Sequence, residues 1–460
     1  MEELSAIILA AGAGTRMKSE KPKVLHEVCG KTLVEWVCDA AYGAGVKNCI
    51  TVVGHKAQMV MDYLGSRVQF ALQEQQLGTG HAVMQAKHLL QDKKGHVIVL
   101  GGDAPLVKAE TIKKALESHI ADNNAATVLT AELSDSTGYG RIVRGKAGRI
   151  VQIVEQKDAT IEQLDIKEVN SGIYCFNISH LLEALSKLSN QNAQGEYYLT
   201  DTLEILIKGN HNVGAMKIEN AYEILGVNDR KQLWQVQQIL NQNIIEKHMY
   251  NGVTVIDPNN TYIDGNVEIM SDTVIHPGCM IQKATKIGAN CIIGPNSQIE
   301  GCTIEDYVEI KNSVMVDSYV SAHTKVGPFA YLRPGSHIGE NVKIGDFVEV
   351  KNAKIGNNTK ISHLSYVGDA QVGENVNMGC GSIVVNYDGK KKQKTIIGDN
   401  AFVGCNVNLV SPVIVHENAF IAAGSTITQE VPKDSLAIAR ERQTIKKDWV
   451  RKRSGQDDTV

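Results

Sequence analysis

After residue 252, aliphatic residues recur at every sixth position, and this repeat constrains the fold more than any other feature of the sequence. Seven isoleucines fall in register, at Ile263, Ile269, Ile275, Ile281, Ile287, Ile293 and Ile299. The register resumes at Val326, Leu332, Ile338, Ile344 and Val350, and again at Ile397, Val403, Leu409, Val415, Ile421 and Ile427. A period of six predicts short parallel strands stacked into a β-helix, with each aliphatic side chain pointing inward onto its counterpart in the next coil.

The repeat has one long interruption, between Ile383 and Ile397, where the chain reads "VVNYDGKKKQKT". This segment is polar and basic, unlike the coils on either side. Function usually resides in a loop that leaves a regular solenoid, so we expect a site there.

The first 230 residues follow a different pattern. Aliphatic runs such as "SAIILAA", "NCITVVG", "HVIVLGG" and "ATVLTAEL" alternate with segments whose apolar residues are three or four positions apart. This rhythm predicts a Rossmann-like α/β domain with a mostly parallel sheet and ligands beyond the C-terminal strand ends. A single amphipathic helix is predicted for 229–250. We therefore expect one domain over 1–230, a linker helix over 231–251 and a second domain over 252–460.

Composition narrows the possible partners. The net charge is −4, from 47 basic and 51 acidic residues, which favours small-molecule substrates over nucleic acid or an anionic membrane. The nine cysteines contain no C-x-x-C, and the 14 histidines show no familiar ligand spacing, so reduced thiols, no structural zinc and a cytoplasmic location are expected. No apolar stretch is long enough to span a bilayer.

Two stretches of the first domain suggest phosphate chemistry. "LAAGAGTRMKSEKPK" has the first two glycines of G-x-G-x-x-G but Met17 in the third place, and it lacks the G-K-[ST] of a Walker loop. Backbone N–H groups with Arg16 and Lys23 could face an anion there; the alternative is a tight turn with solvated basic residues. In "VIVLGGDAPL", Asp103 ends a buried strand, where a carboxylate can hold Mg²⁺ or merely cap a helix.

The ordered motifs carry a family resemblance. "LAAGAGTRMKSEKPK" resembles the signature of sugar-nucleotide pyrophosphorylases. With "QLGTGHAV", "GYGRI", "VEQKDA", "VNSGIY", "NAQGEYYLTD" and "GVNDR", the whole chain is similar to the family of bifunctional N-acetylglucosamine-1-phosphate uridyltransferases/glucosamine-1-phosphate acetyltransferases. Such an enzyme acetylates glucosamine 1-phosphate with acetyl-CoA and then transfers UMP from UTP to the product, giving UDP-N-acetylglucosamine and pyrophosphate for cell-wall synthesis.

The resemblance implies roles for residues of the first domain. Arg16 and Lys23 would act at the α-phosphate and the leaving pyrophosphate, and Asp103 and Asn228 would bind Mg²⁺. The uridine nucleotide would contact Leu9, Ala10, Ala11, Gly12, Gln73, Gly78 and Thr79, with Gly101 and Gly102 beside Asp103. The N-acetyl sugar would be read by Gly140, Glu155 and Asn170. Outside the resemblance, Glu155 could be a solvated acid and Asn228 a turn residue.

It also implies roles in the second domain, which would be a left-handed parallel β-helix. His363 would be the general base, since an imidazole titrates near neutrality. Glucosamine 1-phosphate would be bound by Arg333, Lys351, Tyr366 and Asn377, with Asn386 orienting the amine. Acetyl-CoA would contact Tyr387, Lys392, Ala423 and Arg440, and also Cys380 and Cys405 through their main chains. A homotrimer is implied, with "RERQTIKKDWVRKR" as an arm that completes a neighbour's site.

Three other functions compete with this one. The first is a single-activity sugar-1-phosphate nucleotidyltransferase with a structural or regulatory β-helix, which His363, Tyr366 and the loop disfavour. The second is a non-catalytic assembly subunit, which Arg16, Lys23 and Asp103 disfavour. The third, a zinc-dependent hydratase, would need His323, His337 and His363 to converge, and the nucleotide-binding half makes it remote.

Overall fold

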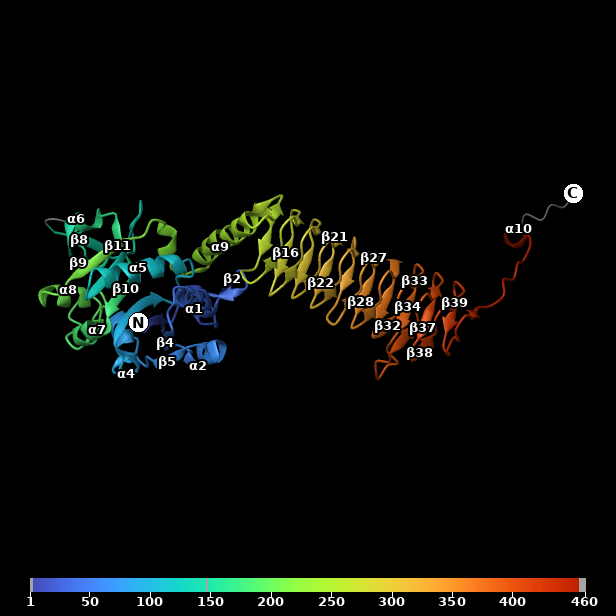
Figure 1. Cartoon of the computed structure of the whole chain (residues 1–460), viewed down its shortest axis with the longest axis horizontal. Coiled ribbons are helices and arrows are strands. Elements are labelled where there is room, and N and C mark those ends of the chain that lie inside the picture. Colours follow the sequence, from blue (N-terminus) through green and yellow to red (C-terminus); the bar gives the residue numbers. More distant parts are fainter. Residues whose placement is uncertain (1–2, 146–147, 455–460) are drawn as a thin grey trace. The chain divides into compact units, whose positions relative to one another are not determined.

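The computed structural model describes residues 3–145 and 148–454 and divides into two compact units, Met1–Asn241 and Gln242–Val460 (Figure 1). The division falls inside one long helix, α9 (Arg230–Tyr250), so the domain limits at 230 and 252 stay predictions. Among the described helices, none is both long and apolar enough to cross a membrane.

The first unit is built on a nine-stranded sheet whose main path has the order β11-β7-β10-β6-β1-β4-β5. Its strands are parallel except β10, which runs antiparallel to β6 and β7, and the added pair β8 and β9. The bounds are β1 Glu3–Ala10, β4 Asn48–Val53, β5 Gln69–Leu72, β6 Gly95–Gly101, β7 Ala126–Glu132, β8 Arg141–Arg144, β9 Ile150–Val154, β10 Glu168–Asn177 and β11 Val213–Lys217. The predicted mostly parallel sheet is confirmed.

Helices cover both faces of this sheet. Ile8 of β1 belongs to one apolar core and Ile7 to the other, as expected for a strand buried on both sides. The helices are α1 Leu33–Gly43, α2 Ala57–Leu64, α3 Thr79–Gln85, α4 Lys87–Leu90, α5 Ala109–Ala121, α6 Ile161–Leu164, α7 Ile178–Leu185 and α8 Asp201–Lys208. A small hairpin joins β2 (Glu27–Val28) to β3 (Lys31–Thr32) just before α1.

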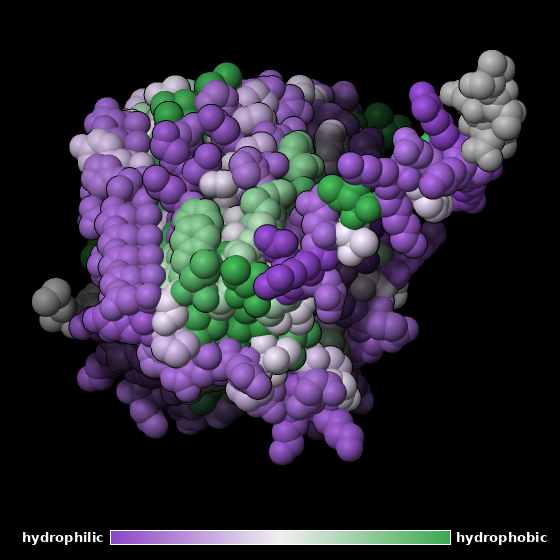
Figure 2. Space-filling view, turned by 90° about the vertical axis from the view of Figure 1, so that its right-hand side faces the viewer, coloured by the Kyte–Doolittle hydropathy of each residue, from purple (hydrophilic) through white to green (hydrophobic). Residues whose placement is uncertain are grey.

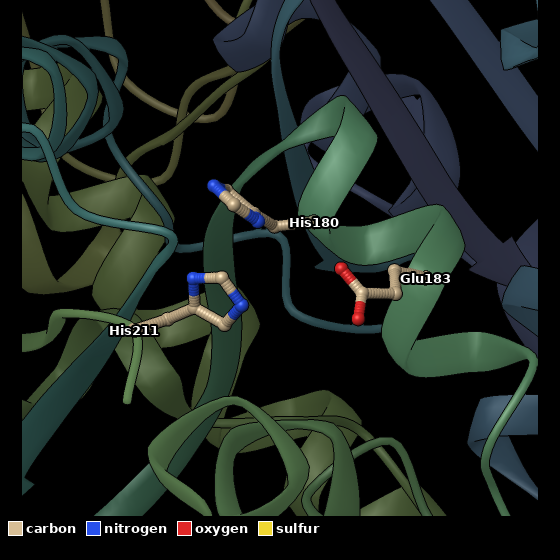
Figure 3. A group of neighbouring side chains, drawn as sticks. All are labelled: His180, Glu183 and His211. Carbon is tan, nitrogen blue, oxygen red and sulfur yellow. The ribbon is translucent and has the colours of Figure 1, made fainter. Parts of the chain in front are cut away.

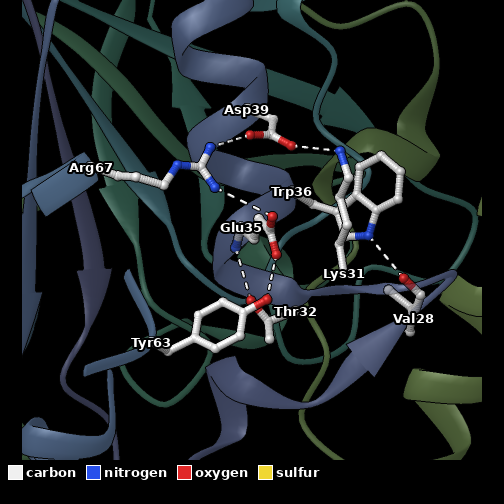
Figure 4. Close-up of polar contacts among 8 residues, drawn as sticks. All are labelled: Val28, Lys31, Thr32, Glu35, Trp36, Asp39, Tyr63 and Arg67. Carbon is white, nitrogen blue, oxygen red and sulfur yellow. Dashed lines mark hydrogen bonds and ion pairs between the residues drawn. The ribbon is translucent and has the colours of Figure 1, made fainter. Parts of the chain in front are cut away.

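Helix α1 is tied to its surroundings by polar contacts at the surface (Figure 4). The Thr32 hydroxyl accepts a hydrogen bond from the Glu35 backbone N–H at 3.3 Å and so caps the helix. The Arg67 guanidinium pairs with Asp39 at 2.6 Å and with Glu35 at 3.3 Å, and Lys31 pairs with Asp39 at 2.7 Å. These contacts fix α1 against α2 and the hairpin that follows the glycine-rich segment.

The second unit is a parallel β-helix with three sheets, in which every third strand from β12 to β40 joins the same sheet, and β41 then pairs with β39. The first sheet contains β12 Thr254–Val255, β15 Val274–Ile275, β18 Ile292–Ile293, β21 Glu309–Ile310, β24 Lys325–Val326, β27 Lys343–Asp346, β30 Lys360–His363, β33 Asn377–Met378, β36 Phe402–Val403, β39 Phe420–Ile421 and β41 Leu436–Ala437.

The other two sheets follow the same rule. The second contains β13 Tyr262–Ile263, β16 Met280–Gln282, β19 Gln298–Glu300, β22 Val314–Val316, β25 Tyr331–Leu332, β28 Glu349–Lys351, β31 Tyr366–Gly368, β34 Ile383–Val385, β37 Asn408–Val410 and β40 Thr426–Ile427. The third contains β14 Glu268–Ile269, β17 Lys286–Ile287, β20 Thr303–Ile304, β23 Tyr319–Val320, β26 His337–Ile338, β29 Lys354–Ile355, β32 Ala370–Val372, β35 Thr395–Ile397 and β38 Val413–Val415.

The six-residue repeat marks the core of this unit correctly. All the aliphatic residues that set the register belong to one buried cluster. At the interruption the prediction was wrong by one position, because Val384 is the inward residue and Ile383 is 41% exposed. Residues 386–394 leave the coil as a loop, closed by a bridge between Tyr387 and Lys392. The C-terminal arm contains α10 (Trp449–Arg453), and none of its residues is buried.

The last coils also expose apolar side chains. In the view from the right-hand side of Figure 1, apolar residues gather among polar ones (Figure 2). Large apolar side chains exposed in these coils are Phe402, Ile414, Phe420, Leu436 and Ile438. The rings of Phe402 and Phe420 stack with centroids 4.4 Å apart, one coil above the other.

Candidate active sites

A cavity of about 670 Å³ opens at the C-terminal ends of β1 and β6 in the first unit. Of the predicted residues, it is lined by Leu9, Ala10, Ala11, Gly12, Arg16, Lys23, Gln73, Gly78, Thr79, Gly101, Asp103 and Asn228. The sheet brings them together because its parallel strands end at one edge. Gly102 is buried beneath this lining, where an added Cβ would lie 2.9 Å from the Leu9 carbonyl oxygen.

Lys23 joins the two predicted magnesium ligands. Its ammonium forms an ion pair with the Asp103 carboxylate and donates to Asn228 Oδ1 at 3.2 Å. A carboxylate and an amide oxygen thus converge on one cation, and oxygen donors of this kind suit Mg²⁺. The pair therefore fits the metal that the sequence resemblance implies.

The glycine-rich segment owes its form to Gly14 and Met17. Gly14 has φ +60°, and an added Cβ would lie 2.7 Å from Cβ of Lys23, so only glycine lets the Lys23 stem pack against the turn. Met17 is 1% exposed and packs with Val28 and Leu33. The position that holds a third glycine in dinucleotide-binding loops is therefore a core position here.

The side chain of Gln73 is buried and is held in one position by its neighbours. It is 3% exposed, and its amide Nε2 donates to the Gly78 carbonyl at 3.2 Å and lies 3.0 Å from His81 Nδ1. The Thr79 hydroxyl accepts from the Leu199 backbone N–H at 3.1 Å, so the start of α3 is fixed to the segment before α8.

The three predicted sugar-binding residues meet one another beside the cavity rather than in its lining. An added Cβ at Gly140 would lie 3.5 Å from both Glu155 Oε1 and Asn170 Cβ. The Asn170 amide donates to the Tyr174 hydroxyl at 2.7 Å, and the next residue, Ser171, lines the cavity. Burial raises the pKa of Glu155, and Asp158 and Asp201 raise it further.

Several lining residues were missed by the sequence analysis. They are Gln76, Thr137, Gly138, Tyr139, Ser171, Gly172, Glu196 and Gln232. Most of them lie in or beside motifs that had been recognised, including "QLGTG", "GYGRI", "VNSGIY" and "NAQGEYYLTD". Burial, with the Asp103 carboxylate nearby, raises the pKa of Tyr139 and keeps its hydroxyl protonated. A search of the polar residues in these motifs would have found Gln76, Tyr139, Ser171 and Glu196, but not the two glycines or Gln232.

On the β-helix, the predicted phosphate ligands form a cationic group. Arg333 and Lys351 follow paired positions of β25 and β28, so they stack on successive coils. Arg333 also pairs with Glu349 at 2.8 Å. The ammonium of Lys392, which reaches over from the loop, lowers the pKa of Lys351, as does Arg333. Cations that repel one another in this way favour an anion between them.

Tyr366 and Asn386 lie beside this group. The Asn386 amide donates to Asp369 Oδ2 at 2.6 Å and to the Tyr366 hydroxyl at 3.3 Å. The Tyr366 ring lies over Gly368, where an added Cβ would be 2.3 Å from the hydroxyl. Tyr387, one residue further into the loop, is 57% exposed and its hydroxyl donates to the Gly389 carbonyl at 2.8 Å.

His363 is paired with a carboxylate that the sequence analysis missed. Its Nδ1 lies 2.6 Å from Asp346 Oδ1, and the two residues occupy the same position on neighbouring coils. Because an ionised carboxylate only accepts hydrogen bonds, the neutral imidazole carries its proton on Nδ1 and its lone pair on Nε2. The coil length of 17 residues, counted back from His363, would have identified Asp346.

The position of His363 continues as a column along the coils. The strand registers place Cys380, Cys405 and Ala423 at the equivalent position in the next three coils. Arg440 lies at the end of this column, since an added Cβ at Gly424 would be 3.5 Å from Arg440 Cδ. Four predicted acetyl-CoA contacts thus run in one line away from the base.

Asn377 does not join the cationic group within the chain. It lies on β33 of the first sheet, and it lines a groove of that sheet with Lys343, Lys360 and Asn375. Arg333, Lys351 and Tyr366 belong to the second sheet or its end. The predicted set for glucosamine 1-phosphate is therefore divided between two faces of the β-helix.

The fold and the two sites define a nucleotidyltransferase joined to a hexapeptide-repeat transferase. Residues 5–242 match the family model described as nucleotidyl transferase. Residues 284–318, 317–352 and 394–429 match the model described as bacterial transferase hexapeptide (six repeats). The predicted fold class, with its left-handed parallel β-helix, is confirmed.

Curated relatives match over almost the whole chain. The bifunctional protein GlmU of Acetivibrio thermocellus is 60% identical over 453 residues, 98% of each chain. Those of Clostridioides difficile and Caldanaerobacter subterraneus are 54% and 55% identical over 98% of this chain and 98% and 99% of their own lengths. The chain belongs to the family of bifunctional GlmU proteins, the uridyltransferase/acetyltransferase family that its motifs resemble. It is a bifunctional transferase.

Proposed function

We propose that the two sites described above perform the two reactions of UDP-N-acetylglucosamine synthesis, acetyl transfer on the β-helix and uridyl transfer in the α/β unit. The observation that carries the double activity is the His363–Asp346 pair at 2.6 Å. A β-helix that served only assembly or regulation would not need an imidazole held by a carboxylate beside a cationic group.

In the acetyl transfer, the amine of glucosamine 1-phosphate attacks the thioester carbonyl carbon of acetyl-CoA. The C–N bond forms, the C–S bond breaks, CoA leaves, and His363 Nε2 takes the proton from the amine. Arg333 and Lys351 hold the phosphate, while the Asn386 side chain orients the amine. Acetyl-CoA lies along the column of Cys380, Cys405 and Ala423 toward Arg440.

In the uridyl transfer, a phosphate oxygen of N-acetylglucosamine 1-phosphate attacks the α-phosphorus of UTP, and pyrophosphate leaves. A phosphate is already a nucleophile, so the site acts by positioning and by charge stabilisation. Lys23 and Arg16 stabilise charge on the α-phosphate and the leaving group, and Gln73 reads the uracil edge. Asp103 and Asn228 hold Mg²⁺, which when bound neutralises charge on the phosphate oxygens.

We further propose a homotrimer in the cytoplasm. Support for the trimer comes from Asn377, which lies on a different sheet from the other predicted ligands of glucosamine 1-phosphate. A second copy that placed its first sheet against the second sheet of its neighbour would complete the set. The C-terminal arm is exposed over residues 440–454 and is therefore available to contact such a neighbour.

The experiment assays each half-reaction alone on the full-length chain. Glucosamine 1-phosphate with acetyl-CoA is followed by release of the CoA thiol, and N-acetylglucosamine 1-phosphate with UTP by release of pyrophosphate. Both are expected, and removal of Mg²⁺ with a chelator should abolish pyrophosphate release while sparing CoA release. Pyrophosphate release without any CoA release would instead support a single-activity nucleotidyltransferase.

A further inference from the structure

Two histidines and a glutamate face one another on the surface of the first unit, away from its nucleotide cavity (Figure 3). His180 and Glu183 are three residues apart on α7, and His211 lies between α8 and β11. One ligand atom from each lies within 4.8 Å of the other two. The two imidazole rings are 4.3 Å apart between centroids.

The side chains are free to accept a metal ion. Within residues 3–145 and 148–454, no hydrogen bond involves a ring nitrogen of His180 or His211. Glu183 uses Oε1 to pair with Lys187 at 2.7 Å, which leaves Oε2 available. A neutral imidazole donates a ring-nitrogen lone pair to a metal ion, so both rings can act as ligands.

We propose that His180, Glu183 and His211 bind a zinc ion, in contrast to the expectation from sequence spacing that the chain holds no structural zinc. Two imidazoles and one carboxylate form a ligand set typical of Zn²⁺, with a water in the fourth position. Ligand atoms around a tetrahedral Zn²⁺ lie about 3.4 Å apart, so rotations of these partly exposed side chains close the site. Mg²⁺ prefers oxygen ligands in octahedral geometry and would not compete well.

The proposed site has a structural role, because it lies at the opposite edge of the sheet from the nucleotide cavity. The cavity follows the ends of β1 and β6, whereas α7 begins where β10 reaches the starts of β6 and β7, with Asn177 opposite His96 and Phe176 opposite Ala126. His211 precedes β11, whose first residue pairs with Ala126. Zinc there would link α7 to the connection between α8 and β11.

The test uses the full-length chain after treatment with a chelator. Zn²⁺ is titrated by calorimetry in excess Mg²⁺, and Co²⁺ is used as a visible-absorption probe of the ligand geometry. The variants are His180→Ala with His211→Ala, and the nearly isosteric Glu183→Gln. The matched control is His55→Ala with His88→Ala, which removes two exposed histidines of the same unit.

We expect the wild type and the control to bind one zinc ion per chain at this site. The double variant should lose it, with affinity reduced about 100-fold or more, as at other metal sites whose ligand shell is disturbed. Zinc should also raise the unfolding temperature of the wild type but not of the double variant. No zinc uptake by the wild type, or equal uptake and affinity in the wild type and both variants, would overturn the proposal.

Discussion

At the scale of single residues, both sites depend on partners that are far away in sequence. Lys23 contacts Asp103, 80 positions away, and Asn228, 205 positions away. Motifs identify such residues one at a time, but their contact with one another comes from the order of the strands.

Asp346 is predicted to be a positioning residue for acetyl transfer. Asp346→Asn removes the carboxylate that fixes the His363 tautomer, so kcat for CoA release should fall by about 100-fold, within the range of general-base effects. The KM values for both substrates should change little. Glu430→Gln is the matched control, because Glu430 pairs with His416 at 2.5 Å outside the column. Equal losses in the two variants would remove Asp346 from the mechanism.

His119 is predicted to destabilise the first unit in acid. It is fully buried, and burial, with His96 nearby, lowers its pKa to about 4. The unfolded chain therefore takes up this proton near pH 6.5 and the folded chain only near pH 4, so stability falls as the pH drops between these values. The loss of unfolding free energy approaches about 3 kcal/mol, because each pH unit between the two pKa values costs about 1.36 kcal/mol.

The measurement for His119 is the free energy of unfolding of the first unit between pH 7 and 4. His119→Gln keeps a polar group next to the Thr127 hydroxyl, which His119 Nδ1 contacts at 2.9 Å. The variant should be less stable than the wild type at pH 7 but should show a shallower decline in acid. Parallel declines for the two proteins would show that another group titrates.

At the scale of elements, the sequence predicted the β-helix almost position by position, because each coil repeats the same inward residue. It could not predict which corners of the coils contain catalytic or substrate-binding residues. Asp346, His363, Cys380 and Cys405 share one column, but a period of six treats every corner alike. In the α/β unit the strands were predicted, whereas the grouping of Gly140, Glu155 and Asn170 beside the main cavity depends on the added pair β8 and β9.

The inward isoleucines should contribute to stability in proportion to their burial. Ile281→Ala, at a fully buried position, should cost about 2–5 kcal/mol of unfolding free energy. Ile292→Ala is the matched control, since Ile292 of β18 is 43% exposed, and it should cost less than about 1 kcal/mol. Denaturant unfolding followed by circular dichroism measures both. Similar costs at the two positions would contradict the inward register.

At the scale of the whole molecule, a column of apolar residues on the β-helix favours assembly. Phe329, Phe347 and Leu364 are each more than half exposed, and each has a positive φ between 47° and 59°. Glycine or asparagine occupies the equivalent corners of the adjoining coils, at Asn312, Gly381 and Asn406. Apolar side chains in strained and exposed positions do not help a single chain to fold, so a covering partner explains them better.

The proposed trimer is tested by Phe329→Asp, two coils away from His363. A charge on this column should convert the trimer to a smaller species by light scattering after size exclusion. It should reduce CoA release at low protein concentration while leaving pyrophosphate release intact. Met270→Asp, at another exposed apolar residue of the β-helix, should change neither. An unchanged mass for Phe329→Asp would place the subunit interface elsewhere or exclude it.

The central claim is that one chain carries two separate active sites, and a crossed assay tests it most directly. The full-length chain is incubated with glucosamine 1-phosphate, acetyl-CoA, UTP and Mg²⁺, and free CoA and pyrophosphate are followed separately. Asp103→Ala should release CoA at the wild-type rate without pyrophosphate, while the exposed control Asp62→Ala should release both. His363→Ala should release neither until N-acetylglucosamine 1-phosphate is supplied, and then pyrophosphate at the wild-type rate. Loss of both reactions in Asp103→Ala, or normal CoA release by His363→Ala, would contradict the account.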